Sequence, residues 1–403
     1  MSSKAFIIAC ATLLAGIVAG LFIKLPGVQE AMSVNAGLEQ IQACEKDGNV
    51  ITCSRPIIRN LLSGASVADI MTMLSSKFSP EECHYLGHVV GQQEYIRTKN
   101  LEGTLQQCSR TCDSSCIHGA IGEVFAEAVG LGTPEDDQNV DLEHLSLDEV
   151  QTMGSRLCEE EEACHGIGHV VFQSTRDMGK AMSVCASFSS RYTSSCYNGA
   201  AMEYADILAN RNMRDVPGIK LPDVDTLPKV CTVLSDPIQM RSCFRYYPRM
   251  AMETLQAAGY AKQAAYEKVV KICSSYATSL VRTSCFLGIG AYNAYYVLTD
   301  QEKGIARCRS LPGGGQNQAA CYFGEIAVAV TERQNTLIQY CAKMPSEAYK
   351  SECYQLVFYY LEKFDSVSSS TPLLCETGNT LCQKGYKDRF VQPWDLLFRN
   401  FPS

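Results

Sequence analysis

Cysteine is the residue that most constrains how this chain can fold. The sequence has 21 cysteines in 403 residues, and all but Cys10 lie after an apolar N-terminal segment. An even number of cysteines in an exported chain favours disulfides over free thiols. The sequence has no Cys-x-x-Cys knuckle, which weakens the alternative of a structural zinc site. We therefore expect a body that is cross-linked in an oxidising compartment.

The N-terminal segment independently indicates export. Residues 5–23 are uncharged and largely apolar, and they lie between Lys4 and Lys24. A helix of that length spans roughly 28 Å, close to the ~30 Å hydrocarbon core of a bilayer. Acidic residues follow Lys24, so the positive-inside rule places the C-terminal body in the periplasm or the extracellular space. The sequence predicts a single-pass membrane anchor, and the alternative is a cleaved signal peptide that leaves a secreted protein.

Composition narrows the classes of function. The chain is 46% apolar and 19% charged, which suffices for a large core, and its formal net charge is −8. A protein that binds nucleic acid needs a basic face to neutralise phosphates, so this charge argues against a nucleic-acid partner. The sequence contains no nucleophile elbow, phosphate-binding glycine loop or His-Glu-x-x-His motif, and therefore identifies no enzymatic reaction.

From residue 185 onward the cysteines come in pairs. Ten to twelve residues separate the two members, and the second member always precedes an aromatic residue and an apolar segment of helical character. The pairs are Cys185 with Cys196, Cys231 with Cys243, Cys273 with Cys285, Cys308 with Cys321, and Cys341 with Cys353. The pattern predicts helical hairpins in which a disulfide joins the end of the first helix to the start of the second. Closing a loop of that length stabilises a fold by roughly 3 kcal/mol.

The remaining cysteines fall into two groups. Cys44 and Cys53 bracket a short segment near the start of the chain, and Cys375 and Cys382 bracket another near its end. We expect each of these two pairs to be bonded. For six others the spacing leaves the connectivity open: Cys83, Cys108, Cys112, Cys116, Cys158 and Cys164.

The cysteines that open the second helices recur at intervals of 32 to 48 residues, a period typical of stacked helix pairs. In this spacing, over residues 80–365, the chain resembles disulfide-bridged helical repeats of the Sel1-like and tetratricopeptide-like kinds. The resemblance implies architecture alone: an all-α, solenoid-like array of disulfide-stapled hairpins. The apolar N-terminal segment adds one transmembrane helix before this array. The expected parts are an anchor or signal segment (1–24), a helical lead-in (25–80), a duplicated histidine unit (81–210), hairpin repeats (211–365), and a linker with a small cap (366–403).

The first half of the chain contains a duplication. Cys83-His-Tyr-Leu-Gly-His-Val-Val90 recurs as Cys164-His-Gly-Ile-Gly-His-Val-Val171, and Cys116-Ile-His-Gly-Ala-Ile-Gly-Glu123 recurs as Cys196-Tyr-Asn-Gly-Ala-Ala-Met-Glu203. Five of the six histidines lie in these duplicated motifs: His84, His88, His118, His165 and His169. Histidines at i and i+4 project from one face of a helix and can chelate one ion.

The duplicated histidines predict a metal site, and two arrangements of its ligands remain possible. His118 or Glu123 could complete a set from the next hairpin, or the two units could face each other so that their histidines converge. Because Asn198 replaces His118 in the second copy, two equivalent sites are disfavoured, and one intact site with a degenerate copy, or one shared site, remains. Imidazole ligands suit zinc, copper or iron, including haem iron. The alternative is a set of core histidines, with Gly87, Gly166 and Gly168 permitting close helix contacts.

Two functions of different classes follow. The first is a membrane-tethered protein that binds a transition metal or haem. The second is a metal-free scaffold whose helical array presents a concave surface to proteins or peptides of the cell envelope. Hairpins that continue after the histidines end favour the scaffold, whereas the duplicated histidines favour the metal.

Overall fold

The computed structural model describes only part of the chain in detail. The described residues are 34–44, 50–78, 80–108, 111–112, 114–128, 146–188, 190–209, 222–329, 334–363, 375 and 379–389. The expected anchor (1–24) and the expected linker after residue 365 lie outside them. Among the helices of these residues, none has both the length and the apolar character needed to cross a bilayer.

The described residues form eighteen α-helices and a short 3₁₀-helix, so the all-α prediction is confirmed. The expected helical lead-in contains α2 (Val34–Cys44), α3 (Val50–Leu61) and α4 (Val67–Lys77). A single short helix, α19 (Thr380–Lys387), packs on the last hairpin at the other end.

Between these ends the helices form consecutive pairs. The long second helices are α5 (Pro80–Thr98), α7 (Ser115–Ala128), α9 (Glu161–Thr175), α11 (Thr193–Ala209), α12 (Pro237–Ala257), α14 (Ser279–Thr299), α16 (Gly315–Ala329) and α18 (Glu347–Lys363). The first helices are α6 (Leu101–Gln107), α8 (Leu147–Leu157), α10 (Met178–Ala186), α13 (Lys262–Ser275), α15 (Gln301–Arg309) and α17 (Gln334–Ala342). The long helices pack against one another in chain order from α5 to α18. Before α12, the described residues contain only the 3₁₀-helix η4 (Leu227–Lys229) in place of an expected first helix.

Ten disulfides join the described cysteines, and seven of them are pairs expected from the sequence. Two of the seven lie near the ends of the chain, where Cys44 is bonded to Cys53 and Cys375 is bonded to Cys382. The other five staple the hairpins from residue 185 onward: Cys185 to Cys196, Cys231 to Cys243, Cys273 to Cys285, Cys308 to Cys321, and Cys341 to Cys353. The sequence-based pairings of these fourteen cysteines are therefore the pairings of the structure.

The three remaining disulfides settle the connectivity that the spacing left open. Cys83 is bonded to Cys112, Cys108 to Cys116, and Cys158 to Cys164. All twenty cysteines after the N-terminal segment are thus paired. Such a density of disulfides indicates an oxidising location outside the cytoplasm.

Short polar side chains explain where several helices begin. Before α8, Ser146 and Glu149 form a capping box in which each side chain accepts from the other residue's backbone N–H. At the start of α12, the Asp236 carboxylate accepts from the backbone N–H groups of Ile238 and Gln239, and Pro237 occupies the first helical position. In α9, acidic residues occupy the first turn, where negative charge favours the positive end of the helix dipole.

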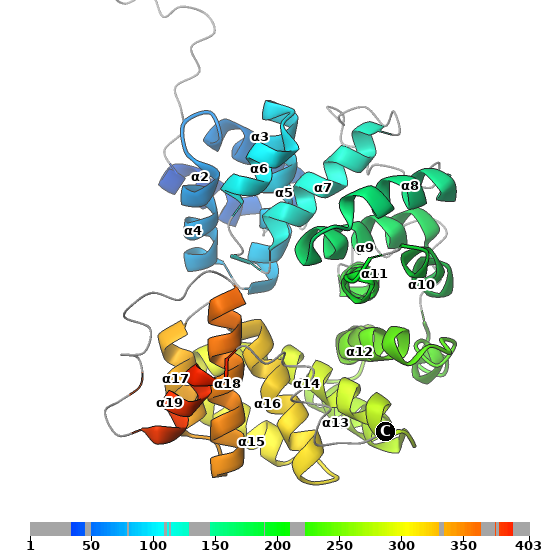
Figure 1. Cartoon of the computed structure of the whole chain (residues 1–403), viewed down its shortest axis with the longest axis vertical. Coiled ribbons are helices and arrows are strands. Elements are labelled where there is room, and N and C mark those ends of the chain that lie inside the picture. Colours follow the sequence, from blue (N-terminus) through cyan, green and yellow to red (C-terminus); the bar gives the residue numbers. More distant parts are fainter. Residues whose placement is uncertain are drawn as a thin grey trace, which may run out of the picture.

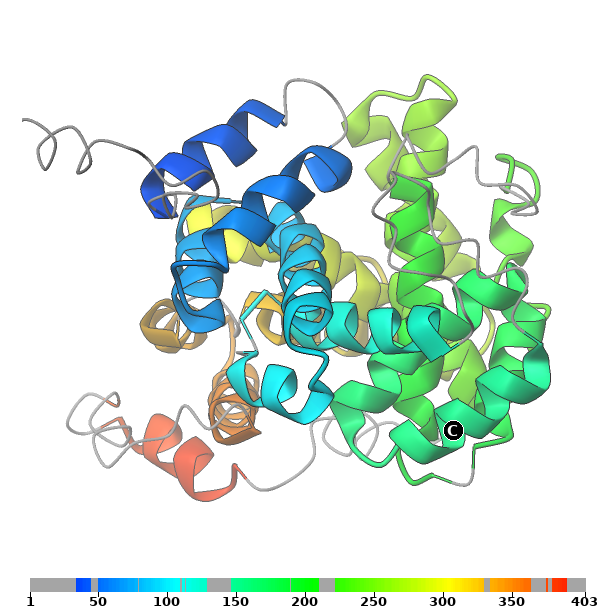
Figure 2. The ribbon, with the colours of Figure 1, turned by 90° about the horizontal axis from the view of Figure 1, so that it is seen from above.

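The array curls so that helices distant in sequence meet. In Figure 1, α2 to α11 form an upper tier and α12 to α19 a lower tier, and Figure 2 shows the upper tier lying over the lower one. Arg249 on α12 donates to the Tyr85 hydroxyl on α5 at 2.9 Å. The same guanidinium forms an ion pair with Asp206 on α11 at 2.5 Å. Arg249 therefore joins the two tiers close to the duplicated unit.

The buried apolar residues separate into two cores. One core extends from α2 to the start of α7, and the other runs from the middle of α7 to α19. Helix α7 contributes to both, with Cys116 in the first and Ile121 in the second. The helices of the duplicated unit therefore lie across the boundary between the cores.

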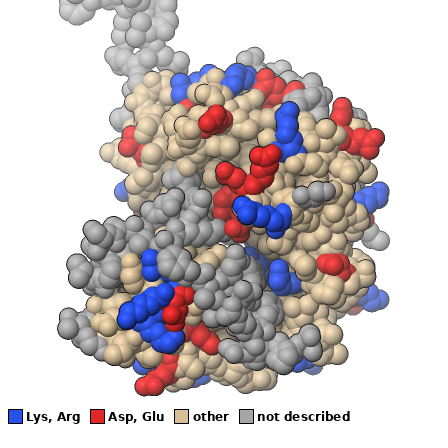
Figure 3. Space-filling model, in the orientation of Figure 1, with Lys and Arg blue, Asp and Glu red and all other residues tan. Residues whose placement is uncertain are grey.

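Charged side chains are mixed on the surface. Figure 3 shows Lys and Arg interspersed with Asp and Glu over the face that it draws, with several acidic side chains gathered near its middle. The described part of this face has no continuous basic area. This distribution agrees with the formal net charge of −8 for the whole chain.

Candidate metal centre

The structure brings the five histidines of the duplicated motifs into one cluster. His84 and His88 come from α5, His118 from α7, and His165 and His169 from α9. Ring centroids of neighbouring members lie 4.7 to 6.4 Å apart. The two copies face each other, as one of the two expected arrangements requires, because His88 and His169 lie 5.5 Å apart.

Glycines hold these helices close enough for the imidazoles to meet. A β-carbon on Gly119 would lie 1.9 Å from the carbonyl oxygen of His88, and one on Gly199 would lie 1.9 Å from that of His165. A β-carbon on Gly166 of α9 would lie 3.3 Å from Cα of His118. The absence of side chains at these positions therefore permits direct backbone contact between the helices that carry the cluster.

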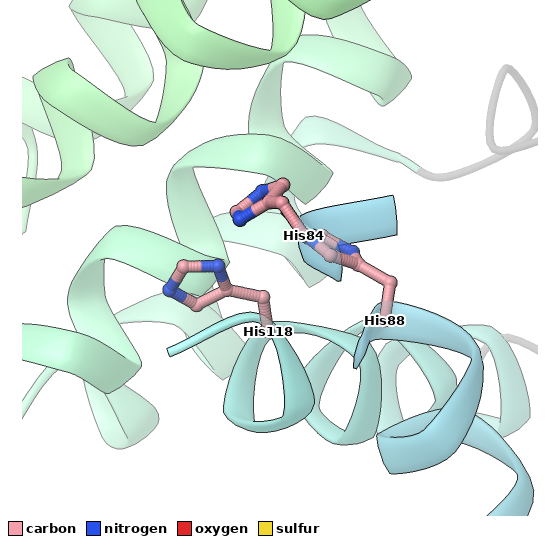
Figure 4. Close-up of side chains that lie close together, drawn as sticks. All are labelled: His84, His88 and His118. Atoms are coloured by element: carbon pink, nitrogen blue, oxygen red, sulfur yellow. The ribbon is translucent and has the colours of Figure 1, made fainter. Parts of the chain in front are cut away.

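The ligand atoms divide into two triads. Within each triad, one ring nitrogen of each histidine lies within 4.8 Å of the others. The first triad is His84, His88 and His118, and the second is His118, His165 and His169. Figure 4 shows His84 and His88 projecting from α5 toward His118. His118 thus belongs to both triads.

In the first triad, the orientation of His84 is set by the backbone. Its Nδ1 lies 3.0 Å from the carbonyl oxygen of Cys112. A carbonyl oxygen can only accept, so Nδ1 carries the proton and Nε2 presents a lone pair. That Nε2 lies 3.1 Å from Nε2 of His88. The disulfide between Cys83 and Cys112 fixes the segment that supplies this carbonyl next to α5.

In the second triad, a carboxylate orients His169. Its Nδ1 donates to Oε2 of Glu203 on α11 at 2.7 Å, and Gln173 donates to the other carboxylate oxygen at 2.7 Å. Nε2 of His169 is buried without a hydrogen-bond partner. Ligating histidines commonly have this second hydrogen bond to a carboxylate or a carbonyl.

His118 has no such support. Its side chain is 3% exposed, and neither Nδ1 nor Nε2 has a hydrogen-bond partner. Burial, and then the neighbouring histidines, lower the pKa of His118 well below the ordinary value. The same causes lower the pKa of His88. Both imidazoles are therefore neutral at pH 7 and able to donate lone pairs.

The spacing of the cluster matches that of ligands around a metal ion. Two imidazole nitrogens bound to a tetrahedral zinc ion lie about 3.3 Å apart, and the centroids of their rings about 5 Å apart. The Nε2 atoms of His84 and His88 are 3.1 Å apart. Ring centroids in the first triad lie 4.7, 5.8 and 5.5 Å apart, and those in the second lie 4.7, 5.1 and 5.1 Å apart. His88 and His165 are half-buried, whereas His84, His118 and His169 are buried.

Two buried acids lie beside the cluster without belonging to a triad. Glu123, which the sequence offered as a ligand, accepts a hydrogen bond from Gln92 at 2.8 Å, and burial raises its pKa. Asp206 pairs with Arg249, and its pKa is raised because burial outweighs the attraction of that guanidinium. Neither acid is grouped with the histidines as a third ligand.

A further group, Cys308, Cys321 and Glu325, also has ligand-type atoms within 4.8 Å of one another. Its two cysteines are bonded to each other, so they offer no thiolate to an ion. The histidine cluster is therefore the stronger candidate among the described residues.

Part of the site could not be read from the motif itself. Glu203 was visible in the sequence as the duplicate of Glu123, but its contact with His169 depends on how α9 packs on α11. The hydrogen bond from Arg249 to Tyr85 could not be predicted from the sequence, because it depends on the curl of the whole array. Two glutamines occupy equivalent positions in the two copies of the motif. Gln92 donates to Glu123, and Gln173 donates to Glu203 in the same way.

The fold and the site together define a class: a disulfide-rich, all-α helical-repeat protein with a buried cluster of histidines. The architecture agrees with that of cysteine-rich helical repeats. No protein-family model, no curated protein and no solved structure matches the chain.

Proposed function

We propose that this protein binds transition-metal ions outside the cytoplasm through the five-histidine cluster. The observation that carries the proposal is His118, which has two buried ring nitrogens without a hydrogen-bond partner and lies among four other imidazoles.

Unsatisfied polar atoms in the cluster carry an energetic cost. A buried polar atom without a partner costs about 1 to 3 kcal/mol, and His118 and His169 together contain three such atoms. A core that needed only bulk would be more stable with apolar residues at these positions. A bound cation satisfies the lone pairs among these atoms, which accounts for imidazoles at these positions.

The donor set favours zinc or copper ions over haem. Neutral imidazoles suit both metals, and the Glu203 carboxylate would raise the basicity of His169 as a ligand. A porphyrin would need a wide slot between its axial histidines, whereas the glycine contacts bring α5 against α7 and α9 against α11. With three imidazoles on an ion, a fourth position stays open for water or substrate, so Lewis-acid or redox chemistry is available to the site.

The expected N-terminal segment would place this site near a membrane. We propose that residues 1–24 tether the protein there, with the disulfide-linked body in the periplasm or the extracellular space. The ten disulfides and the order of charges around residues 5–23 support this placement.

Metal analysis of the purified full chain tests the proposal. The protein is expressed with its disulfides intact in medium that contains zinc and copper, and its metal content is measured by mass spectrometry. We expect at least one ion per chain. Changing His84 and His88 to alanine should lower the content by half or more, with an unchanged circular dichroism spectrum. His144, the histidine outside the duplicated motifs, provides the matched control.

A metal-free wild-type protein that is folded would contradict the proposal. That result would favour the interaction scaffold. The hairpins from α12 to α18, which carry no histidine, support this second candidate. They form a large part of the array, and a compact metal site does not need them.

A further inference from the structure

We infer that the cluster holds two metal ions and that His118 binds both, one through each ring nitrogen. The inference rests on the proposed metal-binding function and adds the number of ions and the way in which they are joined.

The division of ligand atoms supports two ions over one. The nitrogens fall into two sets of three, and His118 is the member that the sets share. His84 and His88 belong only to the first set, while His165 and His169 belong only to the second. A single ion bound by one set would leave two histidines of the other set buried or half-buried beside it without a role.

The ring of His118 suits a bridging position. Both of its nitrogens are buried and lack a hydrogen-bond partner, whereas His84 and His169 each use Nδ1 in a hydrogen bond outside the cluster. Those two histidines therefore have one nitrogen left for a metal, but His118 has two. In Figure 4, one ring nitrogen of His118 lies on the side of His84, and the other lies on the opposite side of the ring.

The packing around His118 places a triad partner on each side of it. His88 of α5 lies at 5.5 Å, and His165 of α9 stacks on the ring at 4.7 Å. Helix α7 lies between α5 and α9, and packs on both. The bridging ligand thus comes from α7, the helix that packs on both α5 and α9. The residue equivalent to His118 in the second copy is Asn198 on α11. The sequence has no further pair of histidines after α11, so no bridging histidine is needed there.

Formation of the bridge releases one proton from His118. A neutral imidazole has one lone pair and one N–H group. The first ion takes the lone pair, and the second ion takes the place of the ring proton, which leaves to water. The resulting imidazolate carries one negative charge, which offsets part of the charge that a second divalent ion brings into the cluster. Glu203 adds a further negative charge through its contact with His169. The ring would separate the two ions by about 6 Å.

Copper provides a direct readout of such a bridge. The metal-free full chain is titrated with Cu²⁺, and bound copper per chain is measured after desalting. Electron paramagnetic resonance is then recorded on the same samples. We expect two copper ions per chain and a signal well below that of two isolated ions, because an imidazolate couples the two unpaired electrons.

Three variants separate the bridge from the rest of the site. His84→Ala and His165→Ala each remove one histidine from one triad, and each should leave one tightly bound copper with a full signal. His118→Ala should abolish the coupling, so that any copper still bound gives its full signal. The His144→Ala control should retain two coupled ions. Circular dichroism and thiol titration show whether each variant keeps its helices and disulfides.

The outcomes distinguish the inference from the proposed function. One ion per chain in the wild type would overturn the inference and leave the metal-binding function standing. Two ions with a full, uncoupled signal would overturn the bridge. Absence of any bound copper and zinc would overturn both.

Discussion

Gly119 and Gly122 lie one helical turn apart on α7, but the surroundings of a β-carbon differ at the two positions. At Gly119 it would lie 1.9 Å from the His88 carbonyl oxygen, and at Gly122 it would meet nothing within 4 Å. Gly119 is therefore required by the contact between α5 and α7. Gly122 has no comparable requirement.

Replacing each glycine by alanine tests this contrast. We expect Gly119→Ala to lower the free energy of unfolding by about 1 to 3 kcal/mol, because the backbones of α5 and α7 must separate. It should also reduce metal binding. Gly122→Ala should leave stability unchanged or raise it by up to about 1 kcal/mol through helix propensity. Urea unfolding of both variants provides the measurement, and equal effects would contradict the close-contact explanation.

At the level of individual residues, the sequence carried more information about the clustered histidines than about their hydrogen-bond partners. The duplication marked all five clustered histidines, because a repeat copies positions that lie on equivalent helix faces. Glu123 was the alternative to His118 for completing the set, and its carboxylate accepts a hydrogen bond from Gln92. The partner of a side chain depends on rotation and spacing of neighbouring helices, which a motif does not specify.

At the scale of elements, the contact between α16 and α17 contains a buried acid. Glu325 is fully buried and accepts a hydrogen bond from the Tyr340 hydroxyl, while its other carboxylate oxygen has no hydrogen-bond partner. Burial raises the pKa of Glu325 to about 8, although Tyr340 and Arg307 act in the opposite direction. This acid therefore binds its proton more tightly in the folded chain than in the unfolded one.

This difference predicts how stability depends on pH. In the unfolded chain Glu325 ionises near its ordinary pKa of about 4.3. Its contribution to stability is fully present below that pH and is lost as the pH rises toward about 8. Glu325→Gln should therefore show a smaller loss of stability between pH 5 and pH 9 than the wild type. Urea unfolding across this range measures the difference, and Glu302→Gln, at an exposed position of α15, is the control. Parallel pH profiles for wild type and Glu325→Gln would contradict the prediction.

The hairpins themselves could be predicted because each carries its own local signal. A cysteine pair, a turn and an apolar segment lie within a few dozen residues, so no long-range packing is needed to recognise them. The region from Cys83 to Cys164 was harder, since several pairings are sterically possible for cysteines four residues apart. There the bonds are decided by how α5, α6 and α7 meet.

At the scale of the whole molecule, the histidine cluster lies where the two apolar cores meet. Helix α7 belongs to both cores, and its His118 contacts imidazoles from α5 on one side and α9 on the other. An ion bound by these three helices would link the two cores. Metal binding should therefore stabilise the array as a unit.

This link predicts a thermal shift. A ligand that binds only the folded state at a hundred times its Kd stabilises it by about 2.7 kcal/mol. We expect zinc to raise the Tm of the metal-free chain and a chelator to reverse the change. His118→Ala should abolish most of the shift, while His144→Ala should preserve it. Differential scanning calorimetry gives the values, and an equal shift in the His118 variant would show that the ion binds elsewhere.

The hydrogen bond from Arg249 to Tyr85 restricts how the number of helices in this chain can change during evolution. In an open array each module touches only its neighbours, so whole modules can be gained or lost without disturbing the remainder. Here the contact between α5 and α12 sets the number of helices that fit between them. A lineage could lengthen this protein beyond α12, but adding a hairpin between α5 and α12 would break the hydrogen bond from Arg249 to Tyr85.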